Sequence, residues 1–377
     1  MSTEQKTPKM LLDSWLLALL KHHGTDLHIK SDAPVRARIK GDIKRLGKTD
    51  VKASIIEEIV KLVTANTYET FLDTKEYDGT YMLSENFRFR VNVYIHHAGY
   101  GLNFRLIKNK ILTLEELNLP PVLHKLSQLQ RGLVLITGTT GSGKSTLLAS
   151  IIEEINQTHN KHIITIEDPI EYTYKDKKSI IEQREVGIHT KSFSTALRAS
   201  MREDPDVIVV GEIRDLDTAE SILQAVNTGH LVFSTIHTLD AKETIDRMVS
   251  IFPTEEQNRV RTSLASTLEA VVSQRLIKGK SGMMIPSVEI MFKNLLIQDL
   301  IRNNRDNEIN DYISQDKQSL GSQTFNQSLF DLVIADKITE ETAYKYASSI
   351  SDLKLMLSLN DDTAVSQEKE ISLKEID

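Results

Sequence analysis

A glycine-rich segment that ends in lysine and serine is the part of this sequence best suited to chemistry. Residues 138–145 are GTTGSGKS, which matches the phosphate-loop pattern G-x-x-x-x-G-K-[S/T]. The apolar residues 133–137 precede it as a predicted strand, and a helix is predicted from Thr146. Lys144 would contact the β- and γ-phosphates, and the Ser145 hydroxyl would bind Mg²⁺. The segment predicts ATP and Mg²⁺ as cofactors, held by Gly138, Thr139, Thr140, Gly141, Ser142, Gly143, Lys144, Ser145 and Thr146.

Acidic residues follow two further predicted strands. Glu167, Asp168 and Glu171 come after the apolar run 163–166, and Glu212 comes after the run 207–210. Ligands of parallel sheets bind outside the carboxyl ends of the strands, so these carboxylates are predicted near phosphate, metal and water. Asp168 is a candidate Mg²⁺ ligand, and Glu212 is the candidate that orients or deprotonates the attacking water. A solvated acidic turn at 167–171 and an ion pair of Glu212 with Arg214 or a lysine are the alternatives.

Two histidines lie on either side of a fourth predicted strand, 231–233. His230 precedes the strand and His237 follows it within TGHLVFSTIHT. The sequence has no cysteine and no H-E-x-x-H spacing, which argues against a metal pair. Hydrogen bonding to the γ-phosphate is the favoured interpretation, and burial for structural reasons is the alternative.

Two groups of arginines are candidates for contact with phosphate. Arg198 and Arg202 are four residues apart and share a helix face, where they reach phosphate or pair with Glu203 or Asp204. A second group of arginines lies on predicted strands of alternating pattern near the N-terminus. These arginines either complete a neighbouring subunit's active site as arginine fingers or form a solvated strand face. The members of this group are Arg88, Arg90 and Arg105.

The elements that must position these residues fall into two domains. Residues 1–107 are predicted to be a small α+β domain, followed by a linker at 108–121. Its predicted elements are a helix over 12–19 that ends near Gly24, strands 26–30, 36–39, 87–93 and 104–107, a turn at 41–42 and a helix over about 52–72.

The second predicted domain, 122–360, is α/β. Near-continuous apolar runs separated by helices indicate a parallel sheet buried on both faces. The runs are 133–136, 163–166, 207–210, 231–233 and 284–290. The pattern is helical from about residue 325. Residues 361–377 carry six acids against two lysines and are predicted to be disordered.

Composition excludes several classes of protein. The 377 residues are 40% hydrophobic and 26% charged, which fits a two-domain globular protein. The net charge of −7 disfavours a DNA translocase, so no nucleic acid partner is expected. Without cysteine the chain forms no disulfide. The apolar stretch at 10–20 is too short to cross a bilayer and no cleavage site follows it, which predicts a cytoplasmic protein.

These motifs together resemble the secretion and pilus ATPases (the GspE/PilT superfamily), and within them the type IV pilus retraction motors of the PilT/PilU type. The resemblance extends from about residue 11 to residue 349. It rests on TDLHIKSDAPVRARIKGDI, GTTGSGKST, ITIEDPIEY, REDPDVIVVGEIRD, TGHLVFSTIHT, EQREVG and RMVSIFP.

The resemblance implies a RecA-like P-loop domain preceded by a PAS-like domain, in a homohexamer whose nucleotide lies between one RecA-like domain and the neighbour's PAS-like domain. Hydrolysis would turn an inner-membrane platform protein at the pilus base so that pilin subunits are withdrawn. Matching motif to motif implies roles for individual residues. These are Glu212 as the catalytic acid, Glu167, Asp168 and Glu171 as the aspartate box near Mg²⁺, His230 and His237 as the histidine box, and Arg88, Arg90 and Arg105 as intersubunit arginines.

Departures from the family pattern bear on the subclass. The four-cysteine insertion and longer N-terminal region of many extension and secretion members are absent, which favours retraction. The retraction signature AIRNLIRE stands here as LIQDLIRN at 296–303, which keeps Ile297, Leu300, Ile301 and Arg302. The alternative is an accessory nucleotide-binding ring that assists a paralogous retraction ATPase. A pilus assembly or type II secretion ATPase and a DNA translocase are further alternatives.

Overall fold

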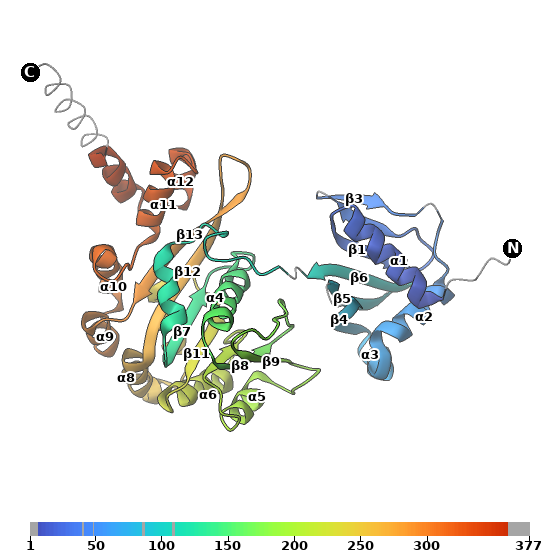
Figure 1. Ribbon diagram of the computed structural model, residues 1–377, viewed down its shortest axis with the longest axis horizontal. Helices are drawn as coiled ribbons and strands as arrows, with labels where there is room; N and C mark the ends of the chain where they lie inside the picture. The colour runs from blue at the N-terminus through green and yellow to red at the C-terminus, as the bar shows by residue number, and fades with distance from the viewer. Residues whose placement is uncertain (1–6, 40, 48, 85–86, 108–109, 361–377) are drawn as a thin grey trace, which may run out of the picture. The chain divides into compact units, whose positions relative to one another are not determined.

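The chain folds into two compact units, Met1–Lys110 and Ile111–Asp377 (Figure 1). The computed structural model describes residues 7–39, 41–47, 49–84, 87–107 and 110–360. The predicted disordered tail at 361–377 lies outside the described residues. No helix within the described ranges is long and apolar enough to cross a membrane.

The N-terminal unit is an antiparallel six-stranded sheet with helices packed on its apolar face. Its strand order is β3-β2-β1-β6-β5-β4. The strands are β1 (Gly24–Lys30), β2 (Arg36–Ile39), β3 (Asp42–Arg45), β4 (Glu76–Ser84), β5 (Phe87–His96) and β6 (Gly99–Ile107). The helices are α1 (Pro8–Lys21), α2 (Ala53–Thr64), the 3₁₀ turn η1 (Ala65–Thr67) and α3 (Tyr68–Thr74). The prediction of a small α+β unit is thus confirmed.

Local sequence explains where these helices begin and end. α1 starts with Pro8 after Thr7, whose side chain accepts a hydrogen bond from the Met10 amide. The single helix predicted over 52–72 is wrong, because α2 ends at Thr64 and Ala65 adopts a φ of +43°. A residue with a positive φ cannot continue a right-handed helix, and a 3₁₀ turn leads into α3. The turn predicted at 41–42 joins β2 to β3.

The second unit contains a seven-stranded sheet of order β13-β12-β7-β11-β10-β8-β9. Its strands are β7 (Gly132–Thr137), β8 (His162–Glu167), β9 (Ile180–Glu185), β10 (Val207–Val210), β11 (Leu231–Ile236), β12 (Leu268–Lys278) and β13 (Met284–Phe292). All neighbours pair in parallel except β13, which is antiparallel to β12. The apolar run 284–290 therefore does not extend the parallel sheet, because the short connection 279–283 permits only a hairpin.

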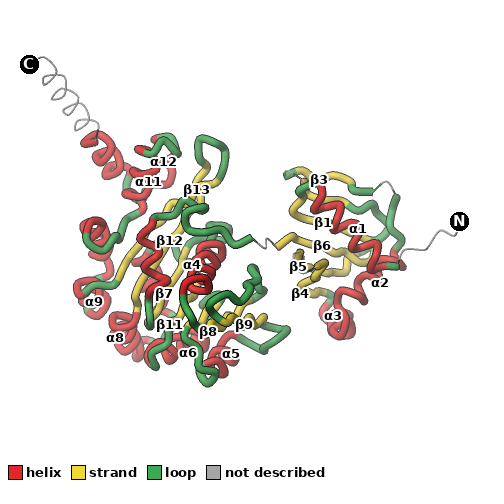
Figure 2. Tube along the Cα trace, in the orientation of Figure 1, coloured by secondary structure: helices red, strands yellow, loops and turns green. Residues whose placement is uncertain are grey.

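Helices bury both faces of this sheet, as the continuous apolar strands predict (Figure 2). One face packs on η2 (Pro121–Gln128) and α4 (Lys144–Thr158). The other packs on α5 (Phe193–Ser200), α6 (Leu216–Asn227), α7 (Ala241–Ser250), α8 (Gln257–Thr267), α9 (Leu295–Arg302) and α10 (Ile309–Gln315). Leu133 and Leu135 face the second set, whereas Val134 and Ile136 face α4.

The ends of the second unit complete its core. α11 (Phe325–Ile334), α12 (Glu340–Tyr346) and the helical segment 350–360 form a separate apolar cluster against Ile277 of β12. At the other end, the linker predicted at 108–121 contains Leu114 and Leu119, which are buried in the core beside α4. These residues pack as part of the second unit, and the division between the units falls after Lys110.

Glu289 in β13 is a buried carboxyl group that links the sheet to α7. It is 4% exposed and accepts a hydrogen bond of 2.8 Å from the Ala241 amide at the start of α7. Burial and, to a smaller extent, the charge of Asp240 raise the pKa of its carboxyl group from 4.5 to about 7, against the opposing effects of the Ala241 hydrogen bond and Arg275. At a pH between these two pKa values, the Glu289 carboxyl group is protonated in the folded chain and ionised in the unfolded chain. The stability that this group contributes is therefore full below about pH 4.5 and is lost as pH rises through 7.

Replacing Glu289 with glutamine is expected to stabilise the second unit at high pH. The amide keeps an acceptor for Ala241 but carries no charge to desolvate. Relative to the parent chain, the gain is about 3 kcal/mol at pH 8.5 and close to zero at pH 4.5. Denaturant unfolding of both chains at the two pH values measures it. The exposed Glu255→Gln serves as control, and a gain of equal size at both pH values would contradict the assignment.

Candidate active site

The phosphate-binding loop connects β7 to α4 at the carboxyl edge of the parallel strands. β7 is buried along its whole length, and α4 begins at Lys144. The loop glycines Gly138, Gly141 and Gly143 have φ values of +141°, +79° and +92°, which other residues rarely adopt. The first amide groups of α4 have no partner within the helix and, with the helix dipole, favour an anion there. The loop predicted from sequence therefore has the geometry of an anion site.

Lys144 lies inside this loop. Its Nζ donates hydrogen bonds to the carbonyl oxygens of Gly138 at 2.7 Å and Thr139 at 3.0 Å, and Nδ1 of His237 lies 3.5 Å away. The residue is 8% exposed. Burial lowers the pKa of the ammonium group, while the carboxylates of Glu212 and Glu171 raise it. A desolvated cation next to acidic side chains is well placed to meet a phosphate, which offers it stronger acceptors than the carbonyls.

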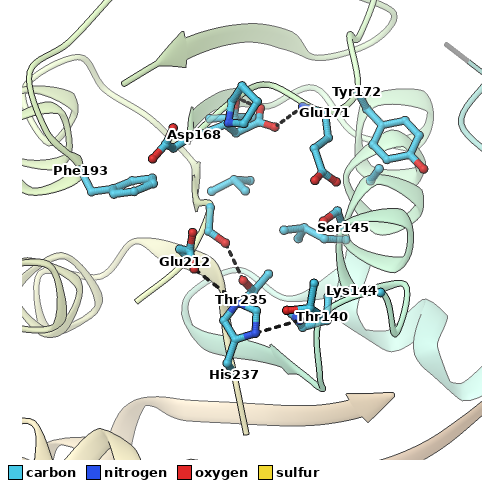
Figure 3. A pocket seen from close by; sticks show the side chains of 18 of the residues that line it. Thr140, Lys144, Ser145, Asp168, Glu171, Tyr172, Phe193, Glu212, Thr235 and His237 are labelled. Atoms are coloured by element: carbon cyan, nitrogen blue, oxygen red, sulfur yellow. Dashed lines mark hydrogen bonds and ion pairs between the residues drawn. The ribbon is translucent and has the colours of Figure 1, made fainter. Parts of the chain in front are cut away.

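The loop opens onto a pocket of about 200 Å³. Figure 3 shows Thr140, Lys144 and Ser145 on the α4 side, with Asp168 and Glu212 on the opposite side. The remaining wall comes from the ends of β8, β10 and β11. The residues that line the pocket are Thr140, Gly141, Lys144, Ser145, Leu148, Ala149, Thr165, Glu167, Asp168, Pro169, Glu171, Tyr172, Tyr174, Phe193, Val209, Gly211, Glu212, Thr235 and His237.

The three acids after β8 differ in their surroundings. Glu167 accepts hydrogen bonds from Thr165 at 2.6 Å and Gln183 at 3.1 Å, and burial raises the pKa of its carboxyl group. The amide of Glu171 donates to Glu167 at 3.4 Å, which ties the turn together. Asp168 is 41% exposed at its side chain. The bonds of Glu167 position the turn, while Asp168 and Glu171 are the more accessible carboxylates.

Glu212 follows β10 and has partners on two sides. It forms an ion pair with Arg214, and its Oε2 lies 3.4 Å from Nε2 of His237. Its side chain is 16% exposed. The ion pair with Arg214 foreseen as an alternative exists, and it coexists with a place in the pocket wall. Arg214 also lies 3.6 Å from Asp168, so it connects two of the acids.

Backbone packing explains why glycine precedes Glu212. The Gly211 amide donates to the Ile166 carbonyl at 2.8 Å, and Thr235 donates its hydroxyl to the Gly211 carbonyl at 2.7 Å. A Cβ atom at residue 211 would lie 3.3 Å from the Ile166 carbonyl oxygen, closer than most such contacts. The place where many nucleotide hydrolases carry an aspartate is thus confined between β8 and β11, and the next residue supplies the carboxylate.

Only one of the two histidines lies at the pocket. His237 follows β11 and lies between Lys144 and Glu212 (Figure 3). His230 precedes the same strand, and its Nδ1 lies 3.1 Å from both the Ala225 carbonyl and the Thr228 hydroxyl. A six-residue strand separates its two ends by about 20 Å, so the structure places His230 at the opposite edge of the sheet. Within one chain it does not join His237 near the phosphate loop.

None of the predicted arginines is among the residues that line the pocket. Arg198 contacts the Ser194 hydroxyl at 3.5 Å, and Glu203 pairs with Arg184 instead of Arg198 or Arg202. The other three lie in the N-terminal unit, where cross-strand pairing places them on one face of the sheet. The pairs are Asp26 with Arg105, Arg105 with Arg90, and Arg90 with Thr80, and Arg88 lies two residues before Arg90.

This polar face holds its arginines in different ways. Arg105 Nε donates to Asp26 at 2.7 Å while its side chain stays 74% exposed. Arg90 is 51% exposed and 3.9 Å from Asp78. Arg88 donates to the Thr80 hydroxyl at 3.0 Å. The face thus presents two exposed guanidinium groups and one that is tied to β4.

The structure adds residues that sequence reasoning missed. Tyr172 OH lies 2.9 Å from the Thr146 hydroxyl and connects the acidic turn to the first turn of α4. Phe193 and Thr235 also line the pocket. Thr235 could have been found from the sequence, because it is a hydroxyl residue within the otherwise apolar strand β11. Nothing in the sequence around Phe193 signals its place, because α5 lies far along the chain from the phosphate loop.

The pocket offers ligands for a Mg²⁺ ion that is bound jointly by the protein and by the phosphates of a nucleotide. Ser145 and Asp168 both line it. Within the described residues no group of three metal-ligating side chains gathers anywhere. Mg²⁺ commonly keeps several waters and takes one or two protein ligands together with substrate phosphates. The donor set therefore suits a cation that arrives with a nucleotide.

Comparisons with known proteins agree with this geometry. The family model "Type II/IV secretion system protein" matches residues 2–328. The type IV pilus retraction ATPase PilT of Pseudomonas aeruginosa is 42% identical over 331 residues, 87% of this chain and 95% of that protein. The type IV pilus ATPase PilU of that organism is 34% identical over 356 residues, 94% and 93% of the two chains. A crystal structure of the pilus retraction motor PilT with bound ADP has a TM-score of 0.84 at 39% identity, covering 91% of this chain and 98% of that one.

Proposed function

The chain belongs to the type II/IV secretion system protein family and is an ATPase of the pilus retraction type, and we propose that it works as a homohexameric ring that turns an inner-membrane platform protein of a type IV pilus. Turning that protein would withdraw pilin subunits and drive twitching motility. The ring would lie in the cytoplasm at the base of the pilus.

One observation carries the chemical part of the proposal. Lys144 of the phosphate loop and Glu212 of the facing strand belong to one pocket, and His237 lies within 3.5 Å of both. Lys144 would hold the β- and γ-phosphates, and Glu212 would orient and deprotonate the attacking water. Ser145 and Asp168 would bind Mg²⁺, which neutralises phosphate charge. His237 would sense the γ-phosphate through the two residues that it already contacts.

The polar face of the N-terminal unit supports completion of the site by a neighbouring subunit. Among the described residues no arginine lines the pocket, and Arg214 pairs with the lining residues Glu212 and Asp168. Phosphoryl transfer gains from a guanidinium group that reaches the γ-phosphate. We assign that role to Arg88, Arg90 and Arg105 of the adjacent chain. His230, distant from its own pocket, is left without a catalytic role in this proposal.

Mixing two inactive variants is expected to restore part of the ATPase activity. Glu212→Gln lacks the catalytic acid, and Arg90→Ala/Arg105→Ala lacks the exposed arginines. In a mixed ring, an interface between an intact acid and intact arginines forms at about one in four positions, so turnover should reach about a quarter of the parent level. Steady-state ATPase assays on equimolar mixtures measure it. If the arginines act within their own chain, the mixture stays as inactive as its components.

The choice between the principal motor and an accessory ring rests on two observations. Identity is higher to PilT than to PilU, at 42% against 34%, which favours the principal motor. In α9, however, the residues kept from AIRNLIRE include the buried Ile297, Leu300 and Ile301, so packing alone accounts for their presence. Of the positions that differ from the signature, Leu296 is 39% exposed, and Asp299 and Asn303 are exposed as well. An altered exposed face favours the second candidate, a ring that binds nucleotide and assists a paralogous ATPase.

Complementation tests the proposal against that candidate. The chain is expressed in a strain that lacks its retraction ATPases, and pilus retraction is scored by microscopy alongside the ATPase rate of the purified protein. A principal motor restores retraction without a paralogue. A chain that hydrolyses ATP rapidly but restores retraction only when the paralogue is present would support the accessory ring.

A further inference from the structure

Gln274 of β12 contacts the phosphate-binding loop from the strand that neighbours β7. β12 pairs in parallel with β7, with Ser273 opposite Thr137, so Gln274 lies next to the point where β7 turns into the loop. The residue is 4% exposed. Its Nε2 donates a hydrogen bond of 2.8 Å to the Ser142 carbonyl within the loop. No motif in the sequence pointed to this residue.

Two of the loop glycines are packed against this one residue. A Cβ atom at Gly138 would lie 2.4 Å from the Gln274 carbonyl oxygen, and one at Gly143 would lie 2.5 Å from Gln274 Nε2. The loop therefore follows the surface of Gln274 at both its ends. Gly138 and Gly143 lack side chains, and this allows the loop to contact β12 closely as well as to approach a phosphate.

The hydrogen bond fixes the direction of an amide group. In a trans peptide, the carbonyl and the N–H of one peptide unit point in opposite directions. Because Gln274 holds the Ser142 carbonyl on the β12 side, the Gly143 N–H of the same peptide points away from Gln274. An N–H in that position is a donor to bound phosphate.

One hydrogen bond joins the Gln274 side chain to the loop. Among the described residues, Gln274 Oε1 and Ser142 Oγ are buried polar atoms without a hydrogen-bond partner. The bond from Nε2 is thus the one by which the glutamine side chain holds the loop, and its loss would leave the Ser142 carbonyl buried and unpaired. An unpaired buried acceptor favours rotation of the peptide, which would turn the Gly143 N–H away from phosphate.

We propose that Gln274 is a positioning residue for nucleotide binding, which orients the Gly143 amide by holding the Ser142 carbonyl. The proposal rests on the proposed function, since it requires that the loop bind a nucleotide. Gln274 contacts the loop and not the phosphates. Its effect is on affinity for the ground state and the transition state alike, so KM changes and kcat does not.

Three variants of the full chain test the proposal by titration with a fluorescent ADP analogue and by steady-state kinetics. Gln274→Met keeps the shape and removes the donor; the nucleotide Kd and the KM for ATP should rise about tenfold, with kcat within threefold. Gln323→Met is the matched control, because Gln323 is also buried and donates to a backbone carbonyl, that of Val288 at 3.0 Å, outside the pocket. It should lower the melting temperature similarly and leave KM within twofold.

Gln274→Glu separates the donor from the shape. A protonated carboxyl group donates to the Ser142 carbonyl and a carboxylate repels it, so nucleotide affinity of this variant should approach the parent value at pH 5.5 and fall below that of Gln274→Met at pH 8.5. Equal losses in Gln274→Met and Gln323→Met, or a Gln274→Glu deficit that does not change with pH, would overturn the inference. Lys144→Ala is measured in parallel: if it binds nucleotide like the parent chain, the proposed function itself fails.

Discussion

Replacing Lys144 with alanine is expected to lower kcat/KM for ATP by about a thousandfold. Its ammonium group is buried in the loop and held by two loop carbonyls, so it is fixed in place before a phosphate arrives. Removing one preorganised donor from a transition state costs about 10²–10³ in rate, and this donor carries a full charge. The variant should also bind ATP more weakly, because the same charge meets the ground-state phosphates. Steady-state kinetics and equilibrium binding measure the two effects.

Lys161→Ala provides a matched control for that variant. Lys161 is a partly buried lysine, with a side chain that is 22% exposed, and it pairs with Asp206 at 2.9 Å just before β8, away from the pocket. Its loss should leave kcat/KM within about twofold, because a mostly surface ion pair contributes only about 1 kcal/mol to folding. Equal losses in the two variants would mean that Lys144 acts through folding and not through phosphate.

Replacing Glu212 with glutamine is expected to lower kcat by about a thousandfold while ATP still binds. Glutamine has nearly the same shape but cannot accept the proton of the attacking water, and general bases contribute about 10²–10⁴ to rate. The neighbouring Lys144 is unchanged, so binding of the phosphates persists. Single-turnover hydrolysis and nucleotide titration distinguish the two quantities.

Arg214→Ala separates the base from the ion pair. If the main task of Glu212 is to hold Arg214, loss of either partner should have the same effect on turnover. If Glu212 acts on water, Arg214→Ala should retain most of its turnover, since His237 still contacts the carboxylate at 3.4 Å. An equal loss in both variants would contradict the assignment of Glu212 as the water-activating group.

The sequence predicted those parts of the site that depend on local spacing. The phosphate loop, the acids after β8 and Glu212 after β10 all lie at the carboxyl edge of parallel strands, and the pocket contains them. That edge is determined once the strands are recognised, because parallel strands end together. The same rule, applied strictly, excludes His230, which precedes its strand. Placing both histidines at the phosphate followed the motif and not the direction of the strand.

What the sequence did not predict depends on contacts between distant segments. β12 was missed because Ser273 and Gln274 interrupt its apolar pattern, and those polar residues make contacts with Thr137 and the loop. β9 is an edge strand with charged residues and has no apolar run. In the N-terminal unit, the period of two placed Arg88 and Arg90 on one face, but the register of β5 with β6 was needed to add Arg105.

β12 also has mechanical consequences. Beside Gln274, the guanidinium of Arg275 lies 3.7 Å from the centre of the Phe325 ring in α11 and donates to the Tyr346 carbonyl at 2.9 Å. Gln274, which holds the loop, and Arg275 are adjacent in a strand that pairs with β13 along both residues and with β7 up to Ser273. Because the two contacts are one residue apart, we expect a displacement of the phosphate loop to be coupled to a displacement of the C-terminal helices. Those helices would then be a place where work released at the nucleotide is delivered.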